Sequence, residues 1–136
     1  MLLSAIPALP VADVTAAARQ YAERFGFDTV HAEAGFAVLE RDQVRITLWQ
    51  ADQRGWQRVG SPPGTSPVRT GAESFLAGTA SCRIQVSNLT GLVAELVRTG
   101  ALHPTKPGPE TTSYGTRELH CLDPDGNQLT FFEQLP

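Results

Sequence analysis

The chain has 136 residues, of which 41% are hydrophobic and 18% are charged, and its formal net charge is −3. This length suits one domain, and the mild acidity without a basic patch argues against a nucleic-acid-binding protein. No apolar run is long enough to span a membrane, and the start of the chain lacks the basic segment of a signal peptide, so we expect a cytoplasmic protein. Two cysteines, Cys82 and Cys121, fit that compartment as reduced core residues.

The first part of the chain predicts a strand, a helix and three further strands. A strand is expected over residues 4–11, and Asp13 is a suitable N-cap for a helix over residues 14–24. Gly26 follows the helix at the position where a left-handed residue usually ends one. Alternation of apolar and polar residues then predicts three short strands, at 28–34, 36–41 and 44–50.

Residues 52–79 interrupt this periodicity. From Asp52 to Gly78 the sequence is rich in glycine and proline, and it carries Trp56. Irregular connections of this length tend to be lids, binding loops or linkers. We therefore expect two modules, residues 1–51 and 80–136, joined by a long loop in which Trp56 either anchors the loop or contacts a ligand.

The second part repeats the order of the first. A strand is predicted over residues 80–86, Asn88 is placed to cap a helix, and Gly100 ends that helix. Further strands are expected near residues 111–113, 116–122 and 128–134. An internal repeat of a βαβββ unit is the natural interpretation.

The last two strands form a hairpin around the sequence Asp-Pro-Asp-Gly-Asn at residues 123–127. Proline fixes one turn dihedral, aspartate hydrogen-bonds its own backbone, and glycine and asparagine accept positive φ. Leu119, Cys121, Leu129 and Phe131 share one face of the hairpin, while the residues between them share the other.

The segment YGTRELHCLDPDGNQLTFFE resembles the closing hairpin of the vicinal oxygen chelate superfamily, which includes glyoxalases, extradiol dioxygenases, fosfomycin-modifying enzymes and bleomycin resistance proteins. The opening segment IPALPVADVTAAARQYAERFGFDTV is similar to the start of many of these proteins. The resemblance implies an α+β fold in which two βαβββ modules form a cup-shaped mixed sheet, with the helices on its convex side.

Enzymes of this superfamily bind a divalent metal through His and Glu residues inside the cup. The matching positions in this chain are Ile6, Thr47, Ser81 and Thr130, none of which is a competent ligand for such a metal. The three histidines, His31, His103 and His120, show no metal-binding spacing. We therefore expect no metal and no cofactor, although a site built from distant residues stays open.

Among the metal-free members, the chain most resembles bleomycin resistance proteins, through RFGFDTVHAEAGFAVLERDQVRITLW as well as the closing hairpin. The resemblance implies a homodimer, usually with exchanged first strands, that confers resistance by sequestering a bleomycin-like glycopeptide or another aromatic natural product. The alternatives are a glyoxalase-like lyase or a dioxygenase with an atypical metal site, and an immunity or regulatory module without a small ligand.

Strand alternation selects candidate residues for ligand binding inside the cup. We expect an aromatic clamp, with polar side chains that orient a flat, polar, heteroaromatic ligand. Each candidate also has a structural interpretation: a core or dimer contact for the strand tryptophan, an ion pair, a hydrogen-bonded histidine, or a loop anchor. The clamp residues are Trp49, Trp56, Tyr114 and Phe132, and the orienting residues are Arg83, Glu118 and His120.

Overall fold

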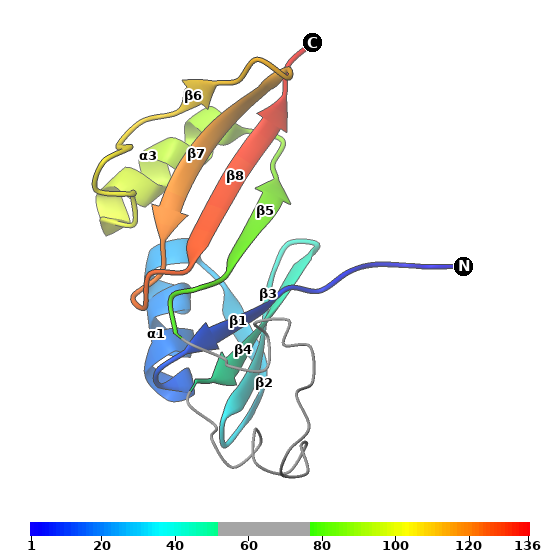
Figure 1. Cartoon of the computed structure of the whole chain (residues 1–136), viewed down its shortest axis with the longest axis vertical. Helices are drawn as coiled ribbons and strands as arrows, with labels where there is room; N and C mark the ends of the chain where they lie inside the picture. Colours follow the sequence, from blue (N-terminus) through cyan, green and yellow to red (C-terminus); the bar gives the residue numbers. More distant parts are fainter. Residues whose placement is uncertain (52–76) are drawn as a thin grey trace, which may run out of the picture.

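The structure, a computed structural model, describes residues 1–51 and 77–136, so Trp56 and most of the predicted loop lie outside the described residues. Each half of the described chain holds one helix and one four-stranded mixed sheet (Figure 1). The elements of the first half are β1 (Ala8–Val11), α1 (Val14–Phe25), β2 (Asp28–Glu33), β3 (Phe36–Arg41) and β4 (Val44–Gln50). Those of the second half are β5 (Ser81–Gln85), α3 (Leu89–Thr99), β6 (Glu110–Thr111), β7 (Thr116–Leu122) and β8 (Gln128–Gln134).

The two sheets have the same topology. Their strand orders are β1-β4-β3-β2 and β5-β8-β7-β6. In each sheet the first strand pairs in parallel with the last one, and the other pairs are antiparallel. The predicted α+β fold with a repeated βαβββ order is therefore confirmed, whereas a cup formed by the two sheets stays a prediction.

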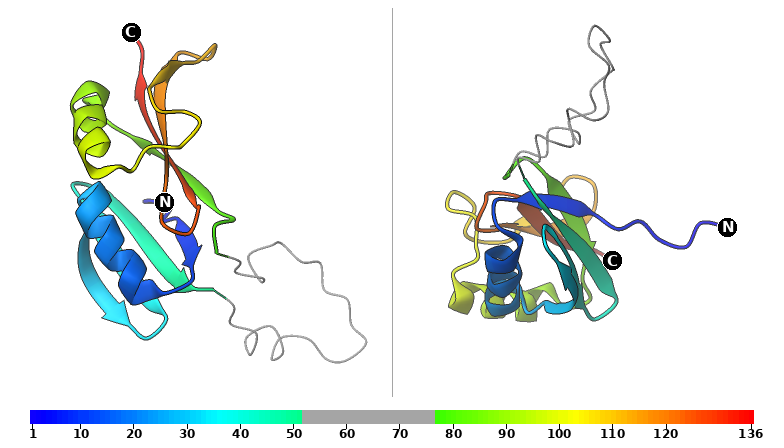
Figure 2. Two further views of the ribbon diagram at one scale, coloured as in Figure 1. Left: turned by 90° about the vertical axis from the view of Figure 1, so that its left-hand side faces the viewer. Right: turned by 90° about the horizontal axis from the view of Figure 1, so that it is seen from below.

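Several predicted strands are shorter than expected, among them the first strand and β6. The first strand begins at Ala8, and the segment before it leads out from the body of the molecule to the N-terminus (Figures 1 and 2). Strand β6 has two residues, Glu110 and Thr111, and it follows Pro107 and Pro109, which have no backbone N–H to donate to a strand neighbour.

Both helices begin and end where their capping residues predict. The Asp13 side chain accepts a hydrogen bond from Ala16 N at 3.0 Å, and the Asn88 side chain accepts one from Gly91 N at 3.0 Å. Gly26 and Gly100 follow the helices at φ values of 70° and 71°. The two helices lie on the same side of the molecule (Figure 2).

The helix-facing sides of the two sheets share one apolar core. Leu39, Leu48, Leu119 and Leu129 are each fully buried. The rings of Phe25 on α1 and Phe131 on β8 lie 6.2 Å apart, which joins the two halves.

The β7–β8 turn joins the second half to the first. Asp123 Oδ2 accepts hydrogen bonds from the Tyr21 hydroxyl at 2.9 Å and from Asn127 Nδ2 at 2.8 Å. Asn127 Nδ2 also donates to Pro10 O at 2.8 Å, and Asp125 Oδ1 accepts from Ala12 N at 2.9 Å. The motif that predicted a turn therefore also ties β1 and α1 to the second sheet.

Candidate functional site

The strand register of the second sheet places the candidate residues on one face. Arg83, Thr130 and His120 lie in one row across β5, β8 and β7, since Arg83 pairs with Thr130 and Thr130 pairs with His120. Phe132 and Glu118 occupy the next row, because the two residues pair directly. Side chains in such rows point to the same side of a sheet, opposite to the core residues Leu119 and Phe131.

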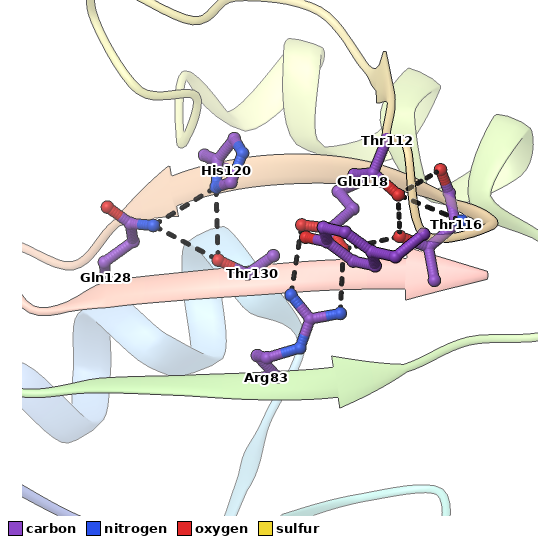
Figure 3. A network of polar contacts seen from close by, with 8 residues as sticks. Arg83, Thr112, Thr116, Glu118, His120, Gln128 and Thr130 are labelled. Atoms are coloured by element: carbon purple, nitrogen blue, oxygen red, sulfur yellow. Dashed lines mark hydrogen bonds and ion pairs between the residues drawn. The ribbon is translucent and has the colours of Figure 1, made fainter. Parts of the chain in front are cut away.

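Arg83 and Glu118 form a two-pronged ion pair on this face. Arg83 Nη1 donates to Glu118 Oε1 at 3.0 Å and Arg83 Nη2 donates to Oε2 at 2.7 Å (Figure 3). The Glu118 side chain is 3% exposed, whereas the Arg83 side chain is 45% exposed. The carboxylate is thus enclosed, while part of the guanidinium faces solvent.

Two hydroxyl groups complete the surroundings of the carboxylate. Glu118 Oε2 accepts hydrogen bonds from Thr116 Oγ1 at 2.7 Å and from the Tyr114 hydroxyl at 3.0 Å. The Arg83 hydrogen bonds, with support from Thr116 and Tyr114, lower the pKa of Glu118 to about 2 against the opposing effect of burial. The same ion pair raises the pKa of Arg83. Glu118 is therefore held as a carboxylate at neutral pH.

Aromatic rings flank the Arg83 guanidinium. Its central carbon lies 4.4 Å from the centroid of the Phe132 ring and 6.0 Å from that of Tyr114. Both separations lie within the range of about 6 Å over which a cation is attracted to a ring face, and the attraction is stronger at the shorter one. Arg83, Tyr114, Glu118 and Phe132 thus form one cluster, which we call the Arg83 cluster.

His120 lies beside the Arg83 cluster in a second hydrogen-bonded group. Its Nδ1 atom lies 3.2 Å from Thr130 Oγ1 and 3.1 Å from Gln128 Nε2. Gln128 was not a sequence-based candidate, although its even-numbered position on β8 puts it on the same face as Thr130 and Phe132.

Trp49 lies on the first sheet, apart from the Arg83 cluster. Its ring packs 4.7 Å from the ring of Phe36, and the Phe36 ring lies 6.3 Å from the imidazole of His31. Trp49 is 41% exposed. Phe36 was not a sequence-based candidate. Its position directly after the Gly35 turn could have indicated it, because this position pairs with Trp49 across β3 and β4.

The four positions that correspond to metal ligands do not fit a metal. Ile6 offers no donor atom, and Ser81 offers only a hydroxyl, which is a weak ligand. The Thr47 hydroxyl donates to Pro7 O at 3.0 Å, and Thr130 Oγ1 is engaged by His120 and Gln128. Within residues 1–51 and 77–136, no three side chains of His, Cys, Asp or Glu gather in a group that could hold a metal ion.

A groove of about 670 Å³ adjoins Arg83. It is lined by residues 4–7 of the N-terminal segment, by residues 40 and 42–45 at the end of the β3–β4 hairpin, and by residues 83–85 of β5. Elements of both halves of the chain therefore meet at this groove, and Arg83 is part of its lining.

Comparison with known proteins identifies close relatives. Residues 5–131 match the family model described as the Glyoxalase/Bleomycin resistance protein/Dioxygenase superfamily. Proteins named "Bleomycin resistance protein" from Geobacillus stearothermophilus and Staphylococcus aureus are 44% identical over 134 residues, which is 98% of this chain and 98% of each relative.

Solved structures share the fold over nearly the whole chain. One is a bleomycin resistance determinant encoded on the transposon Tn5, with a TM-score of 0.70 and 24% identity, covering 98% of each chain. Another is a bleomycin-binding protein complexed with bleomycin, with a TM-score of 0.68 and 25% identity, covering 98% of this chain and 99% of that one.

Proposed function

Because the chain belongs to the Glyoxalase/Bleomycin resistance protein/Dioxygenase superfamily, we propose that it is a resistance protein that binds and sequesters bleomycin or a bleomycin-like natural product. The observation that carries this proposal is the 44% identity with bleomycin resistance proteins along 98% of the chain. The bleomycin complex of a protein with the same fold and 25% identity supports direct binding.

The Arg83 cluster is the proposed ligand-binding surface. The Arg83 side chain is 45% exposed, and its guanidinium lies against Phe132, so it offers a planar cation on which a heteroaromatic group can stack. Tyr114 is 63% exposed, and the centroid of its ring lies 6.0 Å from the guanidinium carbon, so its ring is available for contact with the same group. Trp49 and His120 are further contacts in this proposal.

The protein is proposed to act as a homodimer. Leu2 and Leu3 are 100% and 88% exposed in a segment that extends from the body, and all six residues of edge strand β2 are exposed. Apolar segments and strand edges of this kind are usually covered by another chain. Light scattering should give twice the chain mass, and a Leu2→Glu, Leu3→Glu variant should shift the protein toward a monomer.

A cytoplasmic location is part of the proposal. Both cysteines are free, and Cys121 is fully buried, which suits a reducing compartment. None of the helices in the described ranges is long and apolar enough to cross a membrane.

Calorimetric titration with metal-free bleomycin tests the proposal. The wild type should bind saturably. Phe132→Ala should bind more weakly, because it removes the ring against which the Arg83 guanidinium is stacked. Val97→Ala, a change of an exposed apolar residue on α3, is the control and should bind like the wild type. Absence of saturable binding by the wild type would refute the function.

The superfamily also contains enzymes, and the metal content separates the two classes. Protein purified without chelators should contain no stoichiometric Zn, Mn, Ni or Fe, since the four ligand positions carry an isoleucine and three hydroxyl residues. A stoichiometric metal would favour a lyase or dioxygenase with an atypical site.

A further inference from the structure

Among residues 1–51 and 77–136, the side-chain hydrogen bonds of His120 all involve one ring nitrogen. Nδ1 contacts Thr130 Oγ1 at 3.2 Å and Gln128 Nε2 at 3.1 Å, and Gln128 Nε2 donates to Thr130 Oγ1 at 3.2 Å (Figure 3). The three side chains come from β7 and β8 and close a triangle of contacts on the open face of the sheet.

This triangle favours one of the two neutral imidazole tautomers. An amide nitrogen such as Gln128 Nε2 can only donate, so Nδ1 of His120 must accept. The hydroxyl of Thr130 is free to donate to the same atom. In the neutral imidazole the proton then sits on Nε2, because only one of the two nitrogens carries it.

The other ring nitrogen, Nε2, makes none of these contacts. It has no hydrogen-bond partner in the described part of the chain. No buried side-chain nitrogen or oxygen in that part lacks a partner. His120 Nε2 is therefore accessible to solvent, and its N–H group can donate to an acceptor on a ligand.

His120 lies near enough to Arg83 for a single ligand to contact both residues. His120 and Arg83 occupy the two ends of the row that passes through Thr130. Two strand spacings separate them, which is about 10 Å. If a planar group of the ligand stacks over Arg83, then either the edge of that group or the group bonded to it lies near His120.

We propose that His120 is a specificity-determining hydrogen-bond donor, positioned by Gln128 and Thr130, that recognises an acceptor next to the stacked group of the ligand. The acceptor class is an amide carbonyl oxygen or an unprotonated ring nitrogen. A ligand without such an acceptor would cover the donor and leave it unsatisfied, and would bind more weakly. This inference rests on the proposed function.

The tautomer is tested without a ligand. In a ¹⁵N spectrum of the labelled protein at pH 8.5, the His120 signals should show the proton on Nε2. A Gln128→Leu variant removes the donor that faces Nδ1 and should give a mixture of the two tautomers. A wild-type spectrum with the proton on Nδ1 would overturn the assignment.

Binding is tested with metal-free bleomycin. His120→Phe keeps a flat ring without a donor and should raise the Kd about three- to tenfold. His120→Gln places an amide N–H near the position of Nε2 and should restore binding to within about twofold of the wild type. Gln134→Leu changes an exposed glutamine on the same face of β8 and is the control.

The outcomes separate this inference from the proposed function. A wild type that binds bleomycin while His120→Phe binds equally well would overturn the role of His120 alone. The same conclusion follows if His120→Gln binds as weakly as His120→Phe. A wild type that does not bind bleomycin would overturn the proposed function and, with it, this inference.

Discussion

The Tyr21 hydroxyl donates a hydrogen bond of 2.9 Å to Asp123 Oδ2, between two residues that are 102 positions apart in the chain. Tyr21 is fully buried on α1, and Asp123 begins the β7–β8 turn. Burial and the neighbouring Asp123 raise the pKa of the phenol well above its usual range, so the hydroxyl keeps its proton and remains a donor.

Tyr21→Phe removes this donor and leaves Asp123 Oδ2 with Asn127 Nδ2 as its remaining side-chain partner. A buried acceptor that loses a partner costs about 1–3 kcal/mol in the free energy of unfolding. Urea unfolding measures that loss. Tyr114→Phe is the matched control, because it also removes a hydroxyl–carboxylate bond but from a ring that is 63% exposed, and it should cost less.

Gly78→Ala should destabilise the protein through a collision with the same turn. A methyl group at Gly78 would lie 2.1 Å from the backbone oxygen of Asp125, at a φ of +77°. Gly100→Ala separates the two effects, since Gly100 has a φ of +71° but no atom within 4 Å of such a methyl group. We expect a loss of about 1–2 kcal/mol for Gly100→Ala and a larger loss for Gly78→Ala. Equal losses in thermal unfolding would show that the collision is relieved at no cost.

The low pKa of Glu118 predicts a dependence of stability on pH. Its folded pKa of about 2 lies below the ordinary value of 4.5, so the carboxylate stabilises the fold fully above pH 4.5 and loses that effect as the pH falls toward 2. The difference in unfolding free energy between the wild type and Glu118→Gln should therefore shrink between pH 5 and pH 2. A difference that stays constant over this range would contradict the charge-based account.

Arg83→Lys tests the two-pronged geometry of the ion pair. A lysine keeps the positive charge but cannot contact both Glu118 oxygens in the same plane or stack on Phe132 in the same way. We expect a loss of about 1 kcal/mol in unfolding free energy and weaker ligand binding. Arg45→Lys, in the exposed pair with Glu40, should change stability by less than about 0.5 kcal/mol. Equal effects of the two changes would reduce the Arg83 pair to an ordinary surface contact.

The sequence predicted the side on which most candidate residues lie. Strand periodicity and the Asp-Pro-Asp-Gly-Asn turn together fix the β7–β8 register, and this register puts Glu118, His120 and Phe132 on one face. Arg83 was selected by the same strand alternation, and its pairing with Thr130 in β8 puts it on that face.

The partners of these residues could not be predicted in the same way. Gln128 reaches His120 because a hairpin brings residues eight positions apart into adjacent strands, and side-chain conformation then selects the contact. The packing of Phe36 on Trp49 depends in the same way on the β3–β4 register. The contact between Asp123 and Tyr21 crosses the two halves, so it depends on how the halves pack, which local patterns do not encode.

The central claim is that the protein protects by binding its ligand without changing it. The most direct measurement is to incubate the protein with a fivefold excess of bleomycin, denature the protein, and determine the mass and amount of all bleomycin species. Sequestration predicts that all bleomycin is recovered after denaturation with its mass unchanged. Before denaturation, the native protein should remove from solution only as much bleomycin as it has binding sites. Conversion of more bleomycin than there are protein chains into a species of different mass would contradict the account and identify an enzyme.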